Sequence, residues 1–354
     1  MPAPPRARRV RGSSIGRYTF STIPRLVSAE GNRKGPRVTQ RYRGNSVAVI
    51  LPCYNEALVI ASVIASFRQA LPEAQIFVFD NASSDGTEEA ARAAGAVVRQ
   101  VTQRGKGNVV RRLFADVDAD IFIMADGDGT YEAQQCRRMV DKLLDNGLDM
   151  VVGTRVPVGA GGEYRPGHRL GNRLLTGTVG RMFGPGFTDM LSGYRVLSRR
   201  FVKSFPSLSR GFEIETELTI HALELRAPFG EVPTAYGSRV EGSRSKLSTV
   251  RDGLLIAEAI VRLFVRERPR QLYLALATIV AIVALLLAIP IFMEYVETGL
   301  VPRFPTAILA GLGMIASLVL AATAVILDSV VTGRTEAKRL RYLEIAGPRA
   351  ADAS

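Results

Sequence analysis

Short apolar runs alternate with amphipathic stretches over residues 46 to about 155 of the chain. The apolar runs lie at 47–53, 75–80, 96–101, 120–126 and 149–154, and stretches with helical spacing lie between them at 57–71, 84–94, 105–117 and 132–146. Apolar runs that stop abruptly at polar residues indicate buried strands, and their alternation with helices predicts βαβ units. The pattern therefore predicts an α/β domain with a mostly parallel central sheet.

The alternation breaks down after residue 156, where glycine and arginine become frequent. We expect one more helix within 211–227 and one more strand within 229–237, so the predicted domain covers residues 46–245. Residues 1–45 carry many arginines against a single acid, Glu30, and have no apolar segment. We expect them to form a basic, flexible arm that is either solvated or held against anionic lipid headgroups. No recognition motif supports nucleic acid as a partner.

Residues 246–270 have apolar positions at helical spacing opposite charged ones. The apolar set is Val250, Leu254, Ala257, Val261 and Phe264, and the charged set is Arg251, Glu258, Arg262 and Arg266. Such a pattern predicts an amphipathic helix. It either lies in a membrane interface or packs on the domain as an ordinary surface helix.

The next segments, 271–292 and 306–327, contain no charged side chain, and each is long enough to cross a hydrocarbon core of about 30 Å. We therefore expect two transmembrane helices within 271–330 and a basic tail at 331–354; the alternative is a buried helical hairpin of a soluble protein. Arginine and lysine flank the outer ends of the pair, which predicts a multi-pass inner-membrane protein with its α/β domain and both termini in the cytoplasm. Gly311 and Gly313 would permit close helix contact and a homo-oligomer.

Composition adds little to this picture. The net charge is +13, and only Cys53 and Cys136 are available for a disulfide. Two cysteines without metal-type spacing argue against a disulfide framework and favour a reducing compartment.

Polar side chains end several of the predicted strands. Asp126 and Asp128 follow the run at 120–126, and the carboxyl edge of a parallel sheet is where open α/β folds bind ligands. Two acids one residue apart repel each other unless a cation lies between them, so they predict a Mg²⁺ or Mn²⁺ site for a diphosphate. Asp80 ends the second run and could accept hydrogen bonds from a base or ribose, or simply form a turn. Lys106 offers positive charge at the start of a helix.

Taken in order, the motifs resemble family 2 glycosyltransferases, in particular the polyprenyl-phosphate branch that includes dolichyl-phosphate mannose synthase and bacterial undecaprenyl-phosphate glycosyltransferases. The resemblance covers about residues 46–250. The set is specific, whereas no single member is. The motifs are PCYNE (52–56), FDNASSDGT (79–87), RGKGN (104–108), DGDGTY (126–131), GTR (153–155), DMLSGYRVLSR (189–199), GFEIETEL (211–218) and RVEGSRSKL (239–247).

The resemblance implies a GT-A-type nucleotide-sugar-binding domain and a role for each matched residue. Asp126 and Asp128 would hold the metal on the donor diphosphate. Arg155 would meet the acceptor phosphate and Lys246 would close over the diphosphate. The helpers it implies are Pro52, Tyr54, Glu56, Asp80 and Lys106 for the nucleotide, Arg169 and Arg173 for the acceptor, and Arg239, Arg244 and Ser245 for the diphosphate.

Five further motif residues stay open. Asp189 and Arg195, in the SGYR segment, could form an internal ion pair that shapes the site. Residues Glu213, Glu215 and Glu217 fall on different faces of a helix, so at most one or two of them can point into the pocket.

Two positions depart from the family pattern. Thr130 stands where mannose synthases have a glutamine that assists the metal, which leaves metal affinity and donor preference open. Asn81 stands where many relatives have an acid beside Asp80, so the sequence does not choose between a UDP-sugar and a GDP-sugar.

The resemblance implies inverting transfer of a sugar from a nucleotide diphosphate to undecaprenyl or dolichyl phosphate, as in the biosynthesis of cell-envelope glycans. A phosphate acceptor is mostly dianionic at neutral pH, so it needs cationic side chains more than a general base. The alternatives are transfer to another lipid or to a polysaccharide, and a non-catalytic membrane scaffold that retains the fold. A processive polysaccharide synthase usually has a Gln-x-x-Arg-Trp motif, and this chain has no tryptophan.

Overall fold

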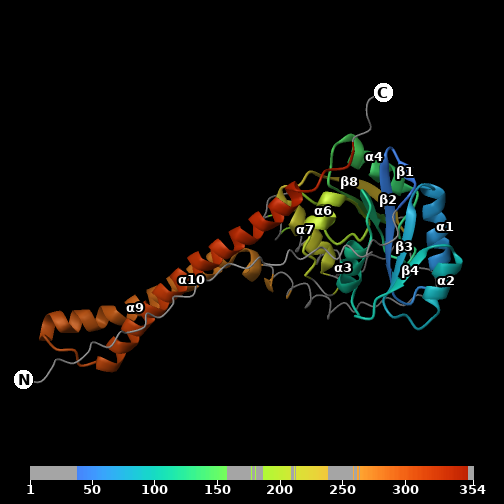
Figure 1. Ribbon diagram of the computed structural model, residues 1–354. Helices are drawn as coiled ribbons and strands as arrows, with labels where there is room; N and C mark the ends of the chain where they lie inside the picture. Colours follow the sequence, from blue (N-terminus) through green and yellow to red (C-terminus); the bar gives the residue numbers. More distant parts are fainter. Residues whose placement is uncertain are drawn as a thin grey trace, which may run out of the picture. The chain divides into compact units, whose positions relative to one another are not determined.

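A computed structural model describes residues 38–157, 186–208, 211, 213–237 and 264–349, together with the single helical positions 177, 180, 258, 261 and 262 (Figure 1). Its centre is an eight-stranded sheet in the order β4-β3-β2-β5-β7-β6-β8, with β1 paired to β2. The strands are β1 Arg41–Tyr42, β2 Asn45–Cys53, β3 Gln75–Asp80, β4 Val97–Gln100, β5 Ile121–Met124, β6 Met150–Pro157, β7 Arg195–Ser198 and β8 Phe229–Tyr236.

The pairing of β2 with β3 and β5, of β3 with β4 and of β6 with β8 is parallel, whereas β7 runs antiparallel between β5 and β6. The mostly parallel sheet predicted from the apolar runs is therefore confirmed. The antiparallel strand β7 was not expected from the sequence.

Helices cover both faces of the sheet, because side chains alternate between the faces along each strand. Along β2, Ala48 and Ile50 belong to one apolar core with α3, α6 and α7, whereas Val47, Val49 and Leu51 belong to a second core with α1, α2 and α4. Every residue of β2 is buried. The helices are α1 Ile60–Ala70, α2 Thr87–Ala93, α3 Lys106–Asp116, α4 Gln135–Asp145, α6 Arg199–Ser204 and α7 Ile214–Leu225.

The sheet begins earlier than the sequence predicted. Strand β1 lies inside the segment expected to be a flexible arm. Arg43, which follows β1, forms ion pairs with Asp141 and Asp145 of α4. The rest of the predicted arm, residues 1–37, lies outside the described residues. Most of the predicted amphipathic helix at 246–270 lies outside them too; residues 264–267 are helical, and α9 begins at Pro269.

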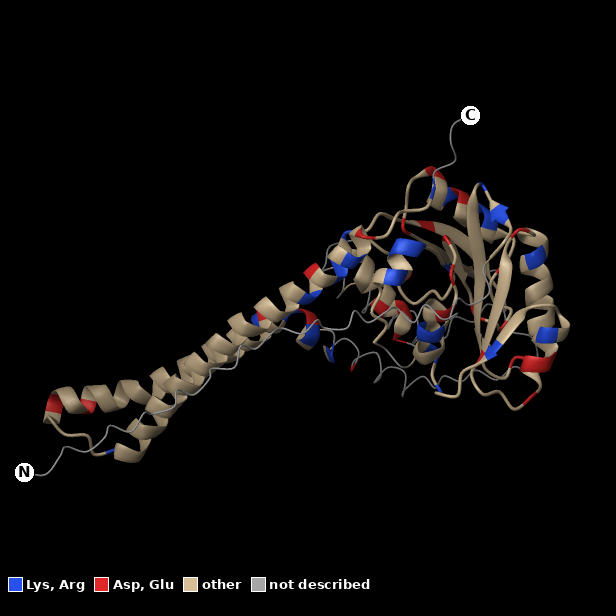
Figure 2. Cartoon of the chain, viewed as in Figure 1, with Lys and Arg blue, Asp and Glu red and all other residues tan. Residues whose placement is uncertain are grey.

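Two apolar helices follow, α9 (Pro269–Thr298) and α10 (Phe304–Leu343). Both are long and apolar enough to cross a membrane, and only 17% of the most apolar window of each is buried, unlike the core helix of a soluble protein. Figure 2 shows their charged residues near the ends and uncharged residues between. Within the pair, Ser317 donates a hydrogen bond to the Ala277 carbonyl, and a Cβ at Gly313 would lie 3.1 Å from Ala284 Cβ. Gly313 therefore permits contact between α9 and α10.

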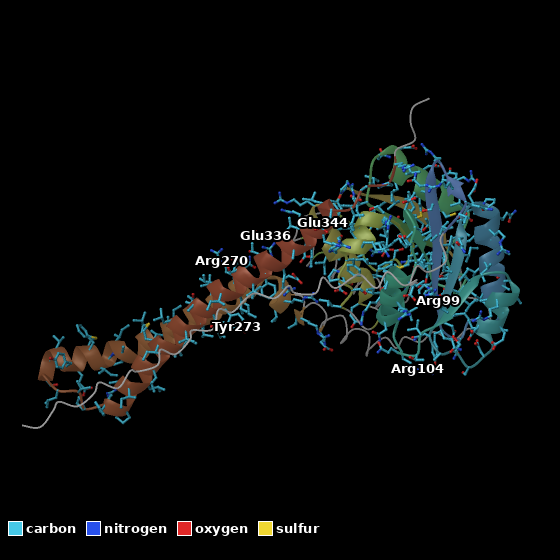
Figure 3. The ribbon with its side chains drawn as sticks, viewed as in Figure 1. Arg99, Arg104, Arg270, Tyr273, Glu336 and Glu344 are labelled. Atoms are coloured by element: carbon cyan, nitrogen blue, oxygen red, sulfur yellow. The ribbon has the colours of Figure 1, made fainter. Side chains whose placement is uncertain are left out.

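Helix α10 does not end with its apolar part but continues to Leu343, into the segment predicted as a basic tail. Its last turns contact α6 and α7 of the α/β domain. Lys338 forms an ion pair with Glu224 of α7, and Tyr342 donates a hydrogen bond to Asp149, just before β6. Figure 3 labels Glu336 and Glu344, which mark this end of α10. One continuous helix thus joins the apolar pair to the α/β domain.

Candidate active site

The parallel strands β2, β3 and β5 end at one edge of the sheet, where the predicted site residues follow them. The Asn81 amide donates to the Cys53 carbonyl, which ties the ends of β2 and β3 together. After β5 the chain passes so close to β2 that a Cβ at Gly127 would lie 2.4 Å from Cys53 Sγ. A glycine is therefore required between Asp126 and Asp128, because any side chain at 127 would push the acidic loop away from the strand ends.

The two aspartates of this loop have different partners. Asp128 is buried and accepts hydrogen bonds from both the backbone amide and the hydroxyl of Thr130 through one oxygen, Oδ1. Thr130 thus orients Asp128. Asp126 is more exposed and forms an ion pair with Lys106, the first residue of α3.

Lys106 lies between two acids. Besides Asp126 it contacts Glu215 of α7, with 2.5 Å between Nζ and Oε1, and its side chain is only 10% exposed. Burial alone would lower the pKa of Lys106, but the charges of Asp126 and Glu215 outweigh it and hold this pKa above its ordinary value. The ammonium is therefore a fixed positive charge in the site at any physiological pH.

The SGYR segment closes this cluster from the β7 side. A Cβ at Gly193 would lie 2.8 Å from Asp126 Oδ2 and 3.2 Å from Lys106 Nζ, so only glycine lets the backbone come this close. The Gly193 amide donates to the Tyr131 hydroxyl at 2.9 Å. Gly193 and Tyr131 thereby hold the SGYR segment against the acidic loop.

At the end of β3, the polar side chains organise loops. Asp80 accepts hydrogen bonds from the backbone amide and the hydroxyl of Ser83, as expected for the turn interpretation of this acid. Asn81 donates to the carbonyls of Val101 and Gln103 and accepts from the Gly105 amide. An acid could not donate these two bonds, so the asparagine found here fixes the loop that leads to Lys106.

Tyr54 lies beside this loop. The Arg104 guanidinium contacts its hydroxyl and lies 4.8 Å from the centre of its ring; Figure 3 labels Arg104 before α3. Arg104 was not among the predicted site residues, although the RGKGN motif contains it. Glu56, two residues after Tyr54, donates its backbone amide to the Thr87 hydroxyl and so connects the PCYNE motif to α2.

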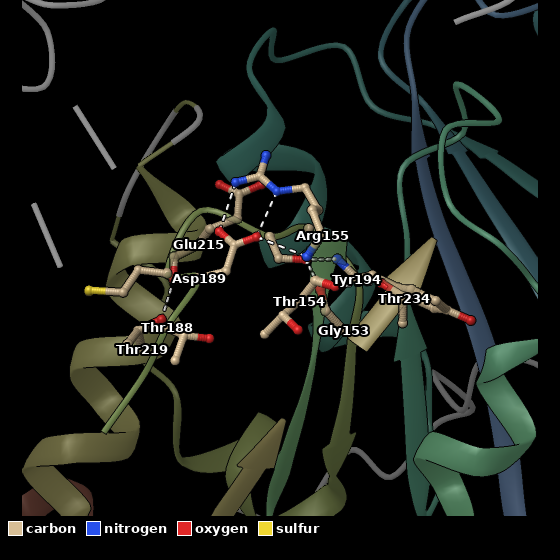
Figure 4. A network of polar contacts seen from close by, with 12 residues as sticks. Gly153, Thr154, Arg155, Thr188, Asp189, Tyr194, Glu215, Thr219 and Thr234 are labelled. Carbon is tan, nitrogen blue, oxygen red and sulfur yellow. Dashed lines mark hydrogen bonds and ion pairs between the residues drawn. The ribbon is translucent and has the colours of Figure 1, made fainter. Parts of the chain in front are cut away.

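Arg155, near the end of β6, is held by Asp189. Its Nε and Nη2 lie 2.8 Å and 2.7 Å from the two carboxylate oxygens, and the Arg155 charge lowers the pKa of Asp189 despite its burial (Figure 4). Arg195 is fully buried and donates to the carbonyls of Met190 and Ser192 and to the Thr219 hydroxyl. Asp189 therefore forms its ion pair with Arg155, whereas the possible pair with Arg195 does not form.

The structure thus brings together part of the predicted set. Lys106 and Asp126 are in contact, Asp128 belongs to the same loop, and Glu215 is the glutamate of its motif that meets them. The rest of the predicted diphosphate and acceptor residues lie outside the described residues: Arg169, Arg173, Arg239, Arg244, Ser245 and Lys246.

The described residues contain no group of three histidines, cysteines or acids placed to hold a metal ion. The pair Asp126 and Asp128 nevertheless fits a hard divalent cation, because Mg²⁺ sites commonly use one or two carboxylates and take their remaining ligands from substrate phosphates and water. Asp126 is the more accessible of the two, with a side chain 29% exposed.

Comparison with known proteins gives the site its context. A sequence model described as glycosyl transferase family 2 matches residues 48–205. Glycosyltransferase AglJ of Haloferax volcanii is 38% identical over 60% of this chain and 70% of its own length. This chain belongs to glycosyl transferase family 2. As a member of that family it is a glycosyltransferase, and the resemblance read from its motifs is confirmed.

More distant relatives indicate the branch. The undecaprenyl-phosphate mannosyltransferase of Micrococcus luteus is 27% identical over 61% of this chain and 91% of that protein. Glucosyl-3-phosphoglycerate synthase of Mycobacterium tuberculosis, crystallised with Mn²⁺, UDP and phosphoglyceric acid, has a TM-score of 0.52 and 26% identity over 62% of this chain and 78% of that chain. This family 2 enzyme is therefore related to polyprenyl-phosphate mannosyltransferases and has a GT-A-like fold.

Proposed function

We propose that this glycosyltransferase moves a sugar from a nucleotide diphosphate to a polyprenyl monophosphate, with inversion at the anomeric carbon, and so makes a lipid-linked monosaccharide. The observation that carries the proposal is the double role of α7. Its first turn places Glu215 beside Lys106 and Asp126, and its last turn places Glu224 against Lys338 of α10. The candidate site and the apolar helix pair are thus joined through one short helix, which suits an acceptor that resides in a membrane.

On the donor side, Pro52, Tyr54, Glu56 and Asp80 would surround the nucleotide. Asp126 and Asp128 would hold Mg²⁺ or Mn²⁺, which when bound supplies positive charge for the departing diphosphate. Lys246 would approach the same diphosphate, with Arg239, Arg244 and Ser245 beside it. The Mn²⁺ and UDP of the mycobacterial neighbour support a divalent cation and a nucleotide on this fold.

On the acceptor side, Arg155 would bind the phosphate, helped by Arg169 and Arg173. Its bidentate contact with Asp189 fixes the plane of the guanidinium before any ligand arrives, and a planar fork matches the oxygens of a phosphate. The acceptor phosphate is already mostly dianionic at neutral pH, so these arginines need only bring two anions together. Electrostatic stabilisation of this kind is usually the largest contribution to catalysis.

The proposed function includes a location in the inner membrane. The basic residues that flank the two apolar helices favour the inner membrane with the catalytic domain and both termini in the cytoplasm, beside anionic lipid headgroups. Assembly into a homo-oligomer is part of the proposal as well.

A donor screen tests the proposal directly. The full chain in detergent is given radiolabelled UDP- and GDP-sugars, undecaprenyl phosphate and Mg²⁺ or Mn²⁺, and extracted lipid is counted. We expect one donor to label the lipid, Asp126→Asn to lower the rate about 10³-fold, and EDTA to abolish it. Asp118→Asn is a matched control, because Asp118 is 44% exposed and pairs with Arg199 instead of the site. Label found only on water-soluble acceptors such as phosphoglyceric acid, or no transfer from any donor, would contradict the proposal.

A further inference from the structure

The cluster of Lys106, Asp126 and Glu215 has a consequence for how ligands bind. In the structure the Lys106 ammonium contacts the same aspartate that the proposed function assigns to a divalent cation. The backbone at Gly193 confines both groups, with 2.8 Å to Asp126 Oδ2 and 3.2 Å to Lys106 Nζ from a Cβ placed there. A metal ion and the ammonium would therefore compete for one carboxylate in a confined space.

We infer that Lys106 is a built-in counter-ion that competes with the divalent cation for Asp126, so that metal binding and nucleotide-sugar binding are coupled. The inference rests on the proposed function. Without donor, Lys106 neutralises Asp126 and repels a second cation, which keeps metal affinity low. The donor diphosphate brings negative charge with which the Lys106 ammonium can pair in place of Asp126. Asp126 then becomes available to the metal.

Glu215 makes this exchange feasible. A buried ammonium that lost its only partner would be strongly destabilised. Lys106 has a second carboxylate, Glu215, whose side chain is only 5% exposed and whose Oε1 lies 2.5 Å from Nζ. When Asp126 turns to a metal, Lys106 stays paired. Lysine suits this role because its ammonium is a compact charge on a flexible stem, whereas a guanidinium prefers one fixed plane. Glu215 is thus a positioning residue that acts through Lys106.

Direct Mn²⁺ binding tests the inference without measuring transfer. The full chain in detergent is titrated with Mn²⁺, with and without UDP, and free Mn²⁺ is followed by electron paramagnetic resonance. For the wild type we expect weak binding of Mn²⁺ alone and much tighter binding with UDP. For Lys106→Met we expect Mn²⁺ alone to bind at least about tenfold tighter than to the wild type, because one nearby positive charge is gone. UDP should then add less to Mn²⁺ affinity.

Three controls sharpen the result. Lys106→Arg keeps the charge and should bind Mn²⁺ alone as weakly as the wild type. Lys142→Met removes a lysine whose ammonium donates to the Glu231 carbonyl, away from the acids, and should change nothing. Asp126→Asn should lose Mn²⁺ in every background.

The inference is overturned if Lys106→Met binds Mn²⁺ alone no tighter than the wild type, or if Lys106→Arg tightens binding equally, since shape and not charge would then be responsible. Either result would leave the proposed function intact as long as the wild type labels polyprenyl phosphate. Conversely, a wild type that binds Mn²⁺ as expected but transfers no sugar would count against the proposed function alone.

Discussion

The two ends of strand β6 bury charge in different ways. Asp149, just before the strand, is fully buried, and its carboxylate accepts hydrogen bonds from Ser198, Arg200 and Tyr342. Arg155, near the other end and about 20 Å away along the strand, is paired with Asp189, and its side chain is 15% exposed. The chain thus has a closed polar cluster at one end of this strand and, at the other end, an ion pair whose arginine keeps part of its surface exposed.

The difference separates structure from function. Donors on β7, α6 and α10 all converge on Asp149, so this acid joins three elements. At the opposite edge Arg155 and Asp126 keep part of their surface accessible, and Lys106 is shared between two acids. Changes at the first edge should therefore cost stability, whereas changes at the second should cost ligand binding and rate.

The largest effect is expected for Asp149→Asn. The amide keeps the size of the side chain but cannot accept from both Arg200 nitrogens, so we expect the free energy of unfolding to fall by about 3 kcal/mol. That corresponds to a melting temperature lower by about 6–12 °C. Circular dichroism is the method of choice, since the chain has no tryptophan. UDP affinity, measured for each protein at the same interval below its melting temperature, should stay unchanged. If UDP affinity fell as much as stability, Asp149 would contribute to ligand binding and this edge of the sheet would not be purely structural.

Asp189→Asn tests the other edge. Arg155 would lose its charged bidentate partner and with it the fixed plane of its guanidinium, so we expect sugar transfer to fall about 100-fold, or about 2.7 kcal/mol in transition-state free energy. Initial rates at varied polyprenyl phosphate measure the change. Glu231→Gln is the matched control. Glu231 accepts hydrogen bonds from Thr188, the residue before Asp189, and does not pair with Arg155. Equal rate losses in both variants would show that the loop matters and not the ion pair.

Much of this arrangement could be predicted from the sequence, and the reasons are local. Strands β2 and β3 are continuous apolar runs that end at polar residues, so their place in a parallel sheet follows from burial alone. Asp126 and Asp128 directly follow such a run, which puts them at the ligand-binding edge without further information. Where an element's environment is uniform, the pattern of residues is sufficient.

What could not be predicted depends on packing between distant segments. The sequence did not show which glutamate of α7 faces the site, because this helix is buried on most sides and has no clear apolar face; its contact with Lys106 of α3 decides in favour of Glu215. The charged turns at the end of α10 were predicted to be a tail, because their partners, Glu224 and Asp149, lie 114 and 193 residues away in the chain. Such contacts leave no local periodicity.

His221 of α7 is a buried group that should make the stability of the domain depend on pH. Burial lowers its pKa to about 3, and the nearby Lys338 charge acts in the same sense. Because the folded state keeps the imidazole neutral, its contribution to stability is complete above the unfolded pKa of about 6.5 and is lost as the pH falls toward 3. At pH 5 the loss should reach about 2 kcal/mol relative to pH 7. Melting curves at pH 7 and pH 5 should show a smaller shift for His221→Gln, which cannot titrate; identical shifts would assign the acid sensitivity to carboxylates elsewhere.

The smallest effect is expected for Tyr342→Phe, which isolates the link between α10 and the α/β domain. The variant removes the hydroxyl that donates to Asp149 but keeps the ring, whose centre lies 4.8 Å from the Arg200 guanidinium. Arg200 and Ser198 still satisfy Asp149, so the cost should be only about 1 kcal/mol, a shift of about 2–4 °C in melting temperature. If the shift equalled that of Asp149→Asn, the stability at this edge would come mainly from the contact of α10 with the domain. The hydrogen bonds of Asp149 with Ser198 and Arg200 would then contribute little.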